Sequence, residues 1–262
     1  MSRRLFNFTL KEWEGSFPEK GNGHFILSAS IDKESVSGLG KNIRREFTVF
    51  CEPNDDNGFS RIVSVKTISS DIKLHSESLA VKDLVNQLSL LYENCTLKVK
   101  YDGTILGVIN YLQIQNNWKK LRQYIEQDYK GSQIRKFIRS IDNRLETEKK
   151  IISDISSFEN FGLLFHAIYG KYDSLSPEIK EFLFVGMKKV YPIKENIKVS
   201  ALNDVNVVLV TEMDEQYTEY VAYSGSYEIN STNQWIEKAS VKTKDSNDGV
   251  EILNEFYLKQ KV

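Results

Sequence analysis

Residues 97–129 read LKVKYDGTILGVINYLQIQNNWKKLRQYIEQDY, and the spacing of the apolar residues changes within this stretch. Apolar and polar residues alternate over 97–101, which predicts a half-buried strand. Asp102-Gly103 then predicts a tight turn into a partner strand over 105–109, because both residues tolerate the conformations of short hairpin turns. Beyond this hairpin the apolar residues recur at helical spacing, at Leu112, Trp118, Leu121 and Ile125. The stretch therefore marks a change from strands to helices.

The sequence before this stretch predicts mainly strands. Period-two alternation and β-branched or aromatic residues mark runs at 6–10, 24–31, 45–51, 61–68 and 71–75. A short amphipathic helix over 79–92, capped by Ser78, follows these strands.

The sequence after this stretch predicts helices and then strands again. One long helix is expected over 134–155 and another over 161–170. A further helix is expected to start at Ser176-Pro177-Glu178, because proline at the first helical position needs no amide partner. Strands return after Pro192, with runs at 197–201, 205–213, 219–229, 235–242 and 250–258.

This order of elements predicts an α+β fold. We expect one curved, half-barrel-like antiparallel sheet built from strands of both ends of the chain, with a central multi-helix insertion packed on its concave face. A single domain over 1–262 would then have a mainly β part at 1–109, a helical insertion at 110–190 and a β meander at 191–262. A division into two domains near Gly170 is the alternative.

The composition predicts a folded protein with no global charge. Of the 262 residues, 40% are hydrophobic, which is far from the composition of disordered chains. Lys+Arg 35 against Asp+Glu 36 leaves a net charge of −1. The whole protein therefore offers no basic field to nucleic acid or to an anionic membrane.

We expect a cytoplasmic protein of a bacterium. Polar residues interrupt the apolar run that follows the first arginines, so no secretory signal is expected, and no window approaches the roughly 18 continuous apolar residues that span a bilayer. Cys51 and Cys95 are too few for a disulfide framework or a thiolate zinc site. Both are expected to be free and buried.

Motifs for catalysis, metals and cofactors are not found. His24, His75 and His166 have no second metal ligand at a suitable spacing, and His166, on an apolar predicted helix, reads as a buried histidine with its own partners. The glycines at 38–42 lack phosphate-loop spacing, and the acidic residues at 52–57 fit a hairpin turn better than a calcium loop. We therefore expect no catalytic residue, no metal and no cofactor.

Two candidate interaction surfaces remain. Ten basic and five acidic residues lie between Lys119 and Lys150, which predicts a basic helical face. A solvated face with interleaved ion pairs is the alternative. The candidate residues of the basic face are Lys119, Arg122, Arg135, Lys136 and Arg139. Three tyrosines of the closing strands are candidates for an interface or a pocket, or else pack across an ordinary sheet: Tyr217, Tyr223 and Tyr227.

The predicted function is binding without catalysis. The Asp102-Gly103 turn, followed by Ile105, Val108, Asn110, Ile114 and Trp118, resembles a pattern of bacterial proteins of similar length, and this resemblance implies no activity. We predict a binding or assembly protein that acts through an interaction surface or cleft, with another protein or a second copy as its partner. The alternatives are a carrier of a small apolar ligand between sheet and helices, and an enzyme or nucleic-acid-associated factor that uses the basic face.

Overall fold

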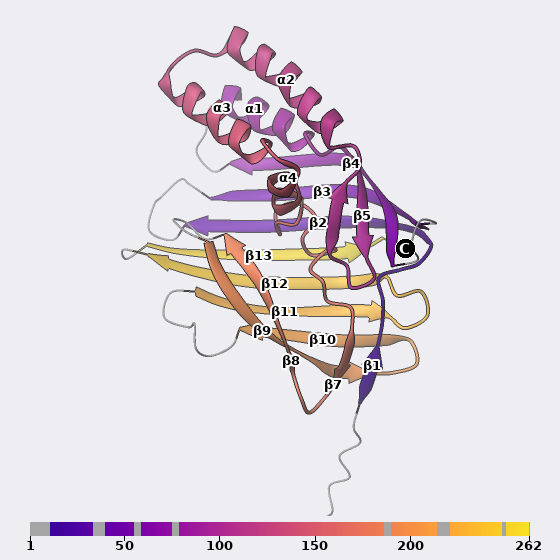
Figure 1. The fold of residues 1–262 in the computed structure, drawn as a ribbon. Helices are drawn as coiled ribbons and strands as arrows, with labels where there is room; N and C mark the ends of the chain where they lie inside the picture. Colours follow the sequence, from indigo (N-terminus) through magenta and orange to yellow (C-terminus); the bar gives the residue numbers. More distant parts are fainter. Residues whose placement is uncertain are drawn as a thin grey trace, which may run out of the picture.

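The computed structural model describes residues 11–33, 40–54, 59–74, 79–185, 190–213, 221–247 and 250–261. In this part of the chain, eleven antiparallel strands form one curved sheet in the order β6-β5-β4-β3-β2-β13-β12-β11-β10-β9-β8 (Figure 1). The N-terminal strands are β2 (Gly21–Lys33), β3 (Lys41–Pro53), β4 (Ser60–Leu74), β5 (Asn94–Lys100) and β6 (Ile105–Val108). The C-terminal strands are β8 (Glu178–Val185), β9 (Val190–Leu202), β10 (Asn206–Met213), β11 (Val221–Asn230), β12 (Ile236–Asn247) and β13 (Val250–Gln260).

The pairing of β2 with β13 joins the two ends of the chain into one sheet. Phe25 is opposite Gln260, and the ladder continues to Lys33 opposite Ile252. The order of the described strands begins with β6 and ends with β8, so the sheet is curved but is not a closed barrel. The predicted α+β fold, with one curved antiparallel sheet made from both ends of the chain, is confirmed. The predicted strand at 6–10 lies outside the described residues.

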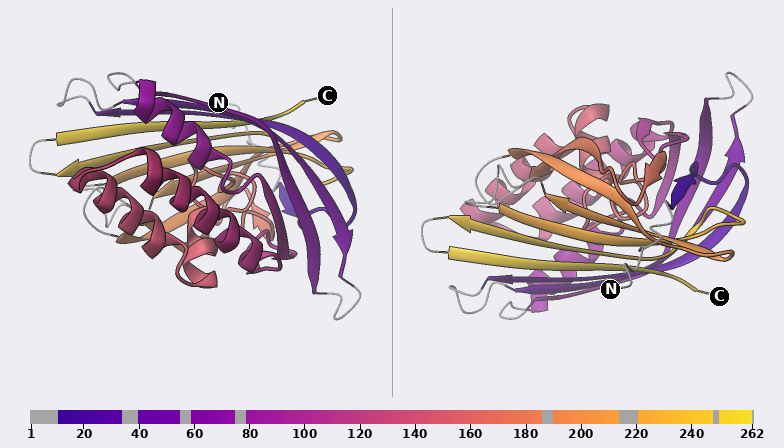
Figure 2. Two further views of the ribbon diagram at one scale, coloured as in Figure 1. Left: turned by 90° about the horizontal axis from the view of Figure 1, so that it is seen from above. Right: turned by 90° about the horizontal axis from the view of Figure 1, so that it is seen from below.

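Helices lie within the curvature of this sheet, as Figure 2 shows from above and below. The described helices are α1 (Leu79–Ser89), α2 (Tyr111–Asp128), α3 (Ser132–Arg144) and α4 (Glu148–Ile155). The prediction of one helix over 134–155 is wrong, because the chain breaks between α3 and α4. The side chain of Thr147 accepts a hydrogen bond from the amide of Lys150 and so caps a new helix.

The Asp102-Gly103 turn between β5 and β6 is confirmed. The amide of Lys100 donates to the carbonyl of Thr104, and the carboxylate of Asp102 accepts from the amide of Thr104. Gly103 has a φ of 95°, a conformation that residues with a Cβ rarely adopt. The turn leads into β6, and α2 follows β6 and buries Ile114, Trp118 and Ile125.

The prediction of a helix over 161–170 is wrong. Residues 156–170, which we call the inner segment, form turns and bends as far as His166 and then continue as irregular chain. Apolar residues at helical spacing also suit a chain that is buried on several sides, and here the curved sheet surrounds the segment. Gly162 fits only without a side chain, since a Cβ atom would lie 2.4 Å from the carbonyl oxygen of Ser156.

The helix predicted to start at Ser176-Pro177-Glu178 is also wrong, because β8 begins at Glu178 and pairs with β9 from Glu178↔Ile197 to Val185↔Val190. The aromatic and β-branched residues near its end favour a strand, and this tertiary pairing overrides the local helix-start signal. The predicted helical insertion at 110–190 is therefore helical only as far as the end of α4.

A second, two-stranded sheet packs beside the main one. It pairs β1 (Glu12–Glu14) with β7 (Lys171–Asp173), and Trp13 stacks on Tyr172 with ring centroids 6.1 Å apart. In the described ranges, none of the helices is both long enough and apolar enough to cross a membrane.

Candidate functional site

The inner segment fills the concave side of the sheet with aromatic side chains. Its Phe161 ring lies 5.0 Å from the ring of Phe47 on β3, and its Phe158 ring lies 5.5 Å from that of Phe256 on β13. The residues of the segment with almost no exposed surface are Phe161, Leu163, Leu164, Ile168 and Tyr169. An irregular stretch of chain therefore packs against the concave face of the sheet.

Arg45 is a charged residue at an inward-facing position of β3. Ile43 and Phe47, two residues away on either side, are buried apolar residues, yet Arg45 is itself only 3% exposed. Its Nη1 donates a 2.9 Å hydrogen bond to the amide oxygen of Asn160 in the inner segment. Its guanidinium carbon lies 5.3 Å from the ring centroid of Phe161, which gives a cation-π contact.

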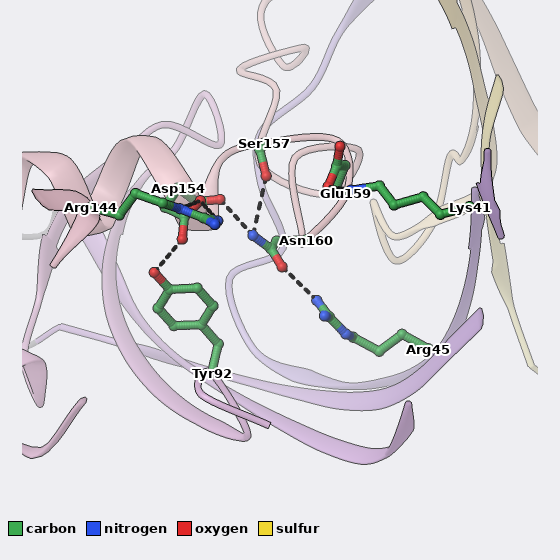
Figure 3. A network of polar contacts seen from close by, with 8 residues as sticks. All are labelled: Lys41, Arg45, Tyr92, Arg144, Asp154, Ser157, Glu159 and Asn160. Carbon is green, nitrogen blue, oxygen red and sulfur yellow. Dashed lines mark hydrogen bonds and ion pairs between the residues drawn. The ribbon is translucent and has the colours of Figure 1, made fainter. Parts of the chain in front are cut away.

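Arg45 and the charged side chains drawn with it are three cations and two carboxylates (Figure 3). Lys41 is paired with Glu159 at 2.6 Å, and Arg144 is paired with Asp154. No carboxylate of the described residues lies within ion-pair distance of Arg45, and its buried Nε has no hydrogen-bond partner among them. The two acids of this cluster are thus each engaged by another cation.

Asn160 connects this cluster to the inner segment. Its amide nitrogen donates to the carbonyl of Asp154 at 2.8 Å and to the hydroxyl of Ser157 at 3.2 Å (Figure 3). Burial lowers the pKa of Arg45 to about 10, so the guanidinium stays charged at neutral pH. Arg45 thus anchors the inner segment as a buried cation, and the neutral amide of Asn160 accepts only one of its hydrogen bonds.

His166 forms a second anchor of the inner segment, on the C-terminal half of the sheet. Its Nε2 lies 3.1 Å from a carboxylate oxygen of Glu195 on β9 and 3.0 Å from the hydroxyl of Tyr223 on β11. The hydroxyl of Thr211 bonds to Tyr223 at 3.2 Å. The side chains of His166 and Glu195 are 7% and 2% exposed. His166 is, as predicted, a buried histidine with partners, although it lies on a turn and not on a helix.

Hydrogen bonds between side chains and backbone carbonyls hold the end of the inner segment. Lys180 on β8 donates to the carbonyls of Ala167 and Tyr169 at 2.7 and 3.2 Å, and burial lowers the pKa of this lysine. Ala167 has a φ of 58°, which is uncommon for a residue with a side chain. The hydroxyl of Tyr169 donates to the carbonyl of Gln234 at 2.8 Å.

The predicted basic residues lie on α2 and α3, away from the inner segment. Lys119, Arg135, Lys136 and Arg139 are exposed. Arg122 instead joins the two helices, since it pairs with Asp142 at 2.9 Å as well as with Glu126 at 3.0 Å. Ion pairs thus cross this face, as the alternative of a solvated face expected, and its role in binding stays a prediction.

Two of the three candidate tyrosines are buried, which agrees with the alternative that they pack across an ordinary sheet, and their role in an interface or a pocket stays a prediction. Tyr223 is 5% exposed and Tyr227 is fully buried, because the alternation of β11 turns both toward the inner segment. Tyr217 lies outside the described residues.

Cys51 and Cys95 are free and buried, as predicted, and burial raises the pKa of each thiol to about 12.

Sequence reasoning missed Arg45, Asn160 and Glu195. Two of them carried a recognisable signal, because Arg45 on β3 and Glu195 on β9 each occupy an inward position between apolar residues of an alternating strand. Asn160 carried none, since its role depends on where the inner segment lies. Among the residues that the structure describes, no group of three metal-ligating side chains is found.

Comparisons with known proteins add no family. No protein-family model and no curated protein matches the chain. A solved structure of lipovitellin, described as showing lipid-protein interactions, is similar with a TM-score of 0.46 and 10% identity over 94% of this chain. The chain spans 25% of the length of that protein. A crystal structure of MucB in complex with MucA(peri) matches with a TM-score of 0.12 and 7% identity, covering 92% of this chain and 89% of that one. Both TM-scores are low, so neither likeness says what this chain does.

Proposed function

We propose that this protein is a non-catalytic carrier that binds an elongated apolar ligand on the concave face of its sheet. The observation that supports the proposal is the filling of this face by the inner segment, a buried stretch that is neither helix nor strand. Its side chains cover Phe47 and Phe256, aromatic residues that an apolar ligand would otherwise contact. The inner segment thus occupies the ligand site.

The polar attachment of the inner segment to the sheet is confined to a few points. The sheet holds it through a few side-chain anchors, at Arg45, Glu195 and Lys180, and not through a continuous ladder of backbone hydrogen bonds. Moving the segment would expose its buried apolar side chains to water, which costs free energy in proportion to the apolar area exposed. A ligand that replaces the aromatic contacts of the segment would offset the cost of moving it.

The leading hypothesis from the sequence, a protein-interaction surface, stays a prediction. The carrier is preferred here because Tyr223 and Tyr227 point inward.

Tryptophan fluorescence tests the carrier directly. Trp235 is buried beside Phe25 and Phe17, with ring centroids 5.7 and 6.1 Å away, whereas Trp118 on α2 donates to Asp142 on α3. Two variants each keep one of these indoles: Trp13→Phe with Trp118→Phe, and Trp13→Phe with Trp235→Phe. A brominated long-chain fatty acid, which quenches an indole on contact, is titrated into both.

We expect saturable quenching that is much stronger for Trp235 than for Trp118. Absence of quenching in both variants would contradict the carrier. Equal, non-saturating quenching in both would also contradict it, since this would indicate adsorption to the surface.

A further inference from the structure

Arg45 is a buried cation without a negatively charged partner among the described residues. A buried ionic group is normally paired, and removing a charge from water without a partner is costly. The nearby carboxylates of Glu159 and Asp154 are engaged by Lys41 and Arg144. Within the described residues, the guanidinium of Arg45 has a neutral amide oxygen on Nη1 and no acceptor on Nε.

We propose that Arg45 binds the anionic head group of the apolar ligand, and that Asn160 occupies the place of this head group. The inference rests on the proposed function and names the ligand class, a long-chain molecule that ends in a carboxylate or a phosphate. One anion beside Arg45 would balance the charges of the cluster that Figure 3 shows.

The chemistry of the guanidinium fits this role. Its planar fork can donate two parallel hydrogen bonds to a carboxylate or a phosphate, and such charge-assisted bonds are stronger than a bond to a neutral amide. The low polarity around Phe161 and Phe47 strengthens the interaction further. An anionic head group would therefore compete well with the amide oxygen of Asn160.

The position of Arg45 along β3 matches an amphiphile. The strand begins at Lys41, whose side chain is 31% exposed, and the next inward positions are Ile43 and Arg45. Beyond Arg45 the inward positions are Phe47 and Val49, both fully buried. A head group at Arg45 would lie near the solvent-accessible end, and its apolar chain would follow the buried positions.

Asn160 and Phe161 suggest how the inner segment imitates this ligand. Asn160 places an oxygen on the guanidinium, and the adjacent Phe161 places an apolar group against Phe47. Displacement of the segment would release the polar and the apolar part of the site together. The same movement would thus admit the head group and the chain.

The test compares three ligands that share one saturated chain and differ only in the head group: hexadecanoate, hexadecyl phosphate and hexadecanol. Their dissociation constants are measured by displacement of the brominated probe from four proteins. These are the natural protein, Arg45→Met, Arg45→Lys, and the control Arg44→Met, in which the exposed neighbouring arginine on the opposite face is changed.

We expect the natural protein and Arg44→Met to bind at least one anionic ligand about tenfold or more tightly than the alcohol. The ratio of the affinity for the anionic ligand to the affinity for the alcohol should fall to near one in Arg45→Met. In Arg45→Lys it should lie between that value and the ratio of the natural protein. Because the ratio is taken within each protein, a general change in stability cancels. The preferred anion distinguishes a carboxylate from a phosphate.

Equal binding of acid, phosphate and alcohol by the natural protein would overturn the role of Arg45 and leave the carrier intact. A ratio that is unchanged in Arg45→Met would overturn it as well. Failure of all three ligands to bind would contradict the proposed function itself.

Discussion

The two anchors of the inner segment, at Arg45 and at His166, differ in their polar partners. His166 lies 3.1 Å from the carboxylate of Glu195 and is also bonded to Tyr223. Arg45 has a neutral amide as its hydrogen-bonded partner, and the acids near it are engaged by other cations. Both anchors join the same segment to inward positions of the same sheet, but the His166 anchor includes a carboxylate, whereas the Arg45 anchor has none within ion-pair distance among the described residues.

This difference indicates different roles for the two anchors. The imidazole of His166 has both a carboxylate and a hydroxyl as partners, so this anchor is adequately explained by holding the inner segment. An unmatched buried arginine adds a desolvation cost that an apolar residue at the same inward position would avoid. A binding role for Arg45 accounts for this cost, because the excess charge is what an anionic ligand would need.

The largest effect is expected from breaking the buried contact between His166 and Glu195. The change His166→Ala leaves the carboxylate of Glu195, which is 1% exposed, without its nitrogen partner. We expect the free energy of unfolding to fall by about 3–5 kcal/mol, as for other broken buried pairs. Urea unfolding followed by circular dichroism measures the loss.

Two controls separate burial from pairing. His24 lies 2.7 Å from Glu46, but these side chains are 32% and 22% exposed, so His24→Ala should cost at most about 1 kcal/mol. Adding Glu195→Gln to His166→Ala should recover part of the stability, because the uncompensated charge is removed. A loss below about 1 kcal/mol in His166→Ala would show that the two anchors are equally weak.

A smaller effect is expected from the thiol of Cys95, which reports the polarity near Arg45. Burial raises the pKa of Cys95 from its ordinary value of 9.0 to about 12, although Arg45 opposes this change. The folded protein therefore keeps a proton that the unfolded chain loses. The resulting stability is fully present below about pH 9 and is lost as the pH rises toward 12.

The measurement compares Cys51→Ala with Cys51→Ala/Cys95→Ala, so that only the second thiol differs between them. Between about pH 9 and pH 10 the variant that keeps Cys95 should lose up to about 1.4 kcal/mol more free energy of unfolding. Identical pH dependence in both variants would mean that the surroundings of Arg45 are polar.

The sheet could be predicted from the sequence, and the inner segment could not. Alternation within each strand and turn residues between strands are local signals, and they sufficed for the curved sheet and for the Asp102-Gly103 turn. The apolar spacing of 161–170 fits both a helix and a buried irregular chain. The sheet that surrounds this segment decides between them, and it is assembled from residues far away in the sequence.

The candidate site divides in the same way. Arg45 and Glu195 are charged residues at positions where the alternation of their strands expects apolar ones. The alternation alone is therefore enough to place them at inward positions. Their partners could not be predicted, because Asn160 and His166 come from turns whose path depends on the packed sheet. The strand alternation can therefore reveal a buried charge, while only the tertiary structure shows whether that charge is matched.

The smallest effect on stability is expected from removing the unmatched charge. Arg45→Met replaces the guanidinium by an apolar side chain of similar length and relieves its desolvation, while the amide oxygen of Asn160 loses its donor. These contributions oppose each other, so the free energy of unfolding should change by less than about 1 kcal/mol, in contrast to His166→Ala. Urea unfolding of Arg45→Met beside Arg44→Met measures this. A loss above about 2 kcal/mol would show that Arg45 holds the fold as His166 does. A small change together with lost discrimination between fatty acid and alcohol would separate binding from folding at this residue.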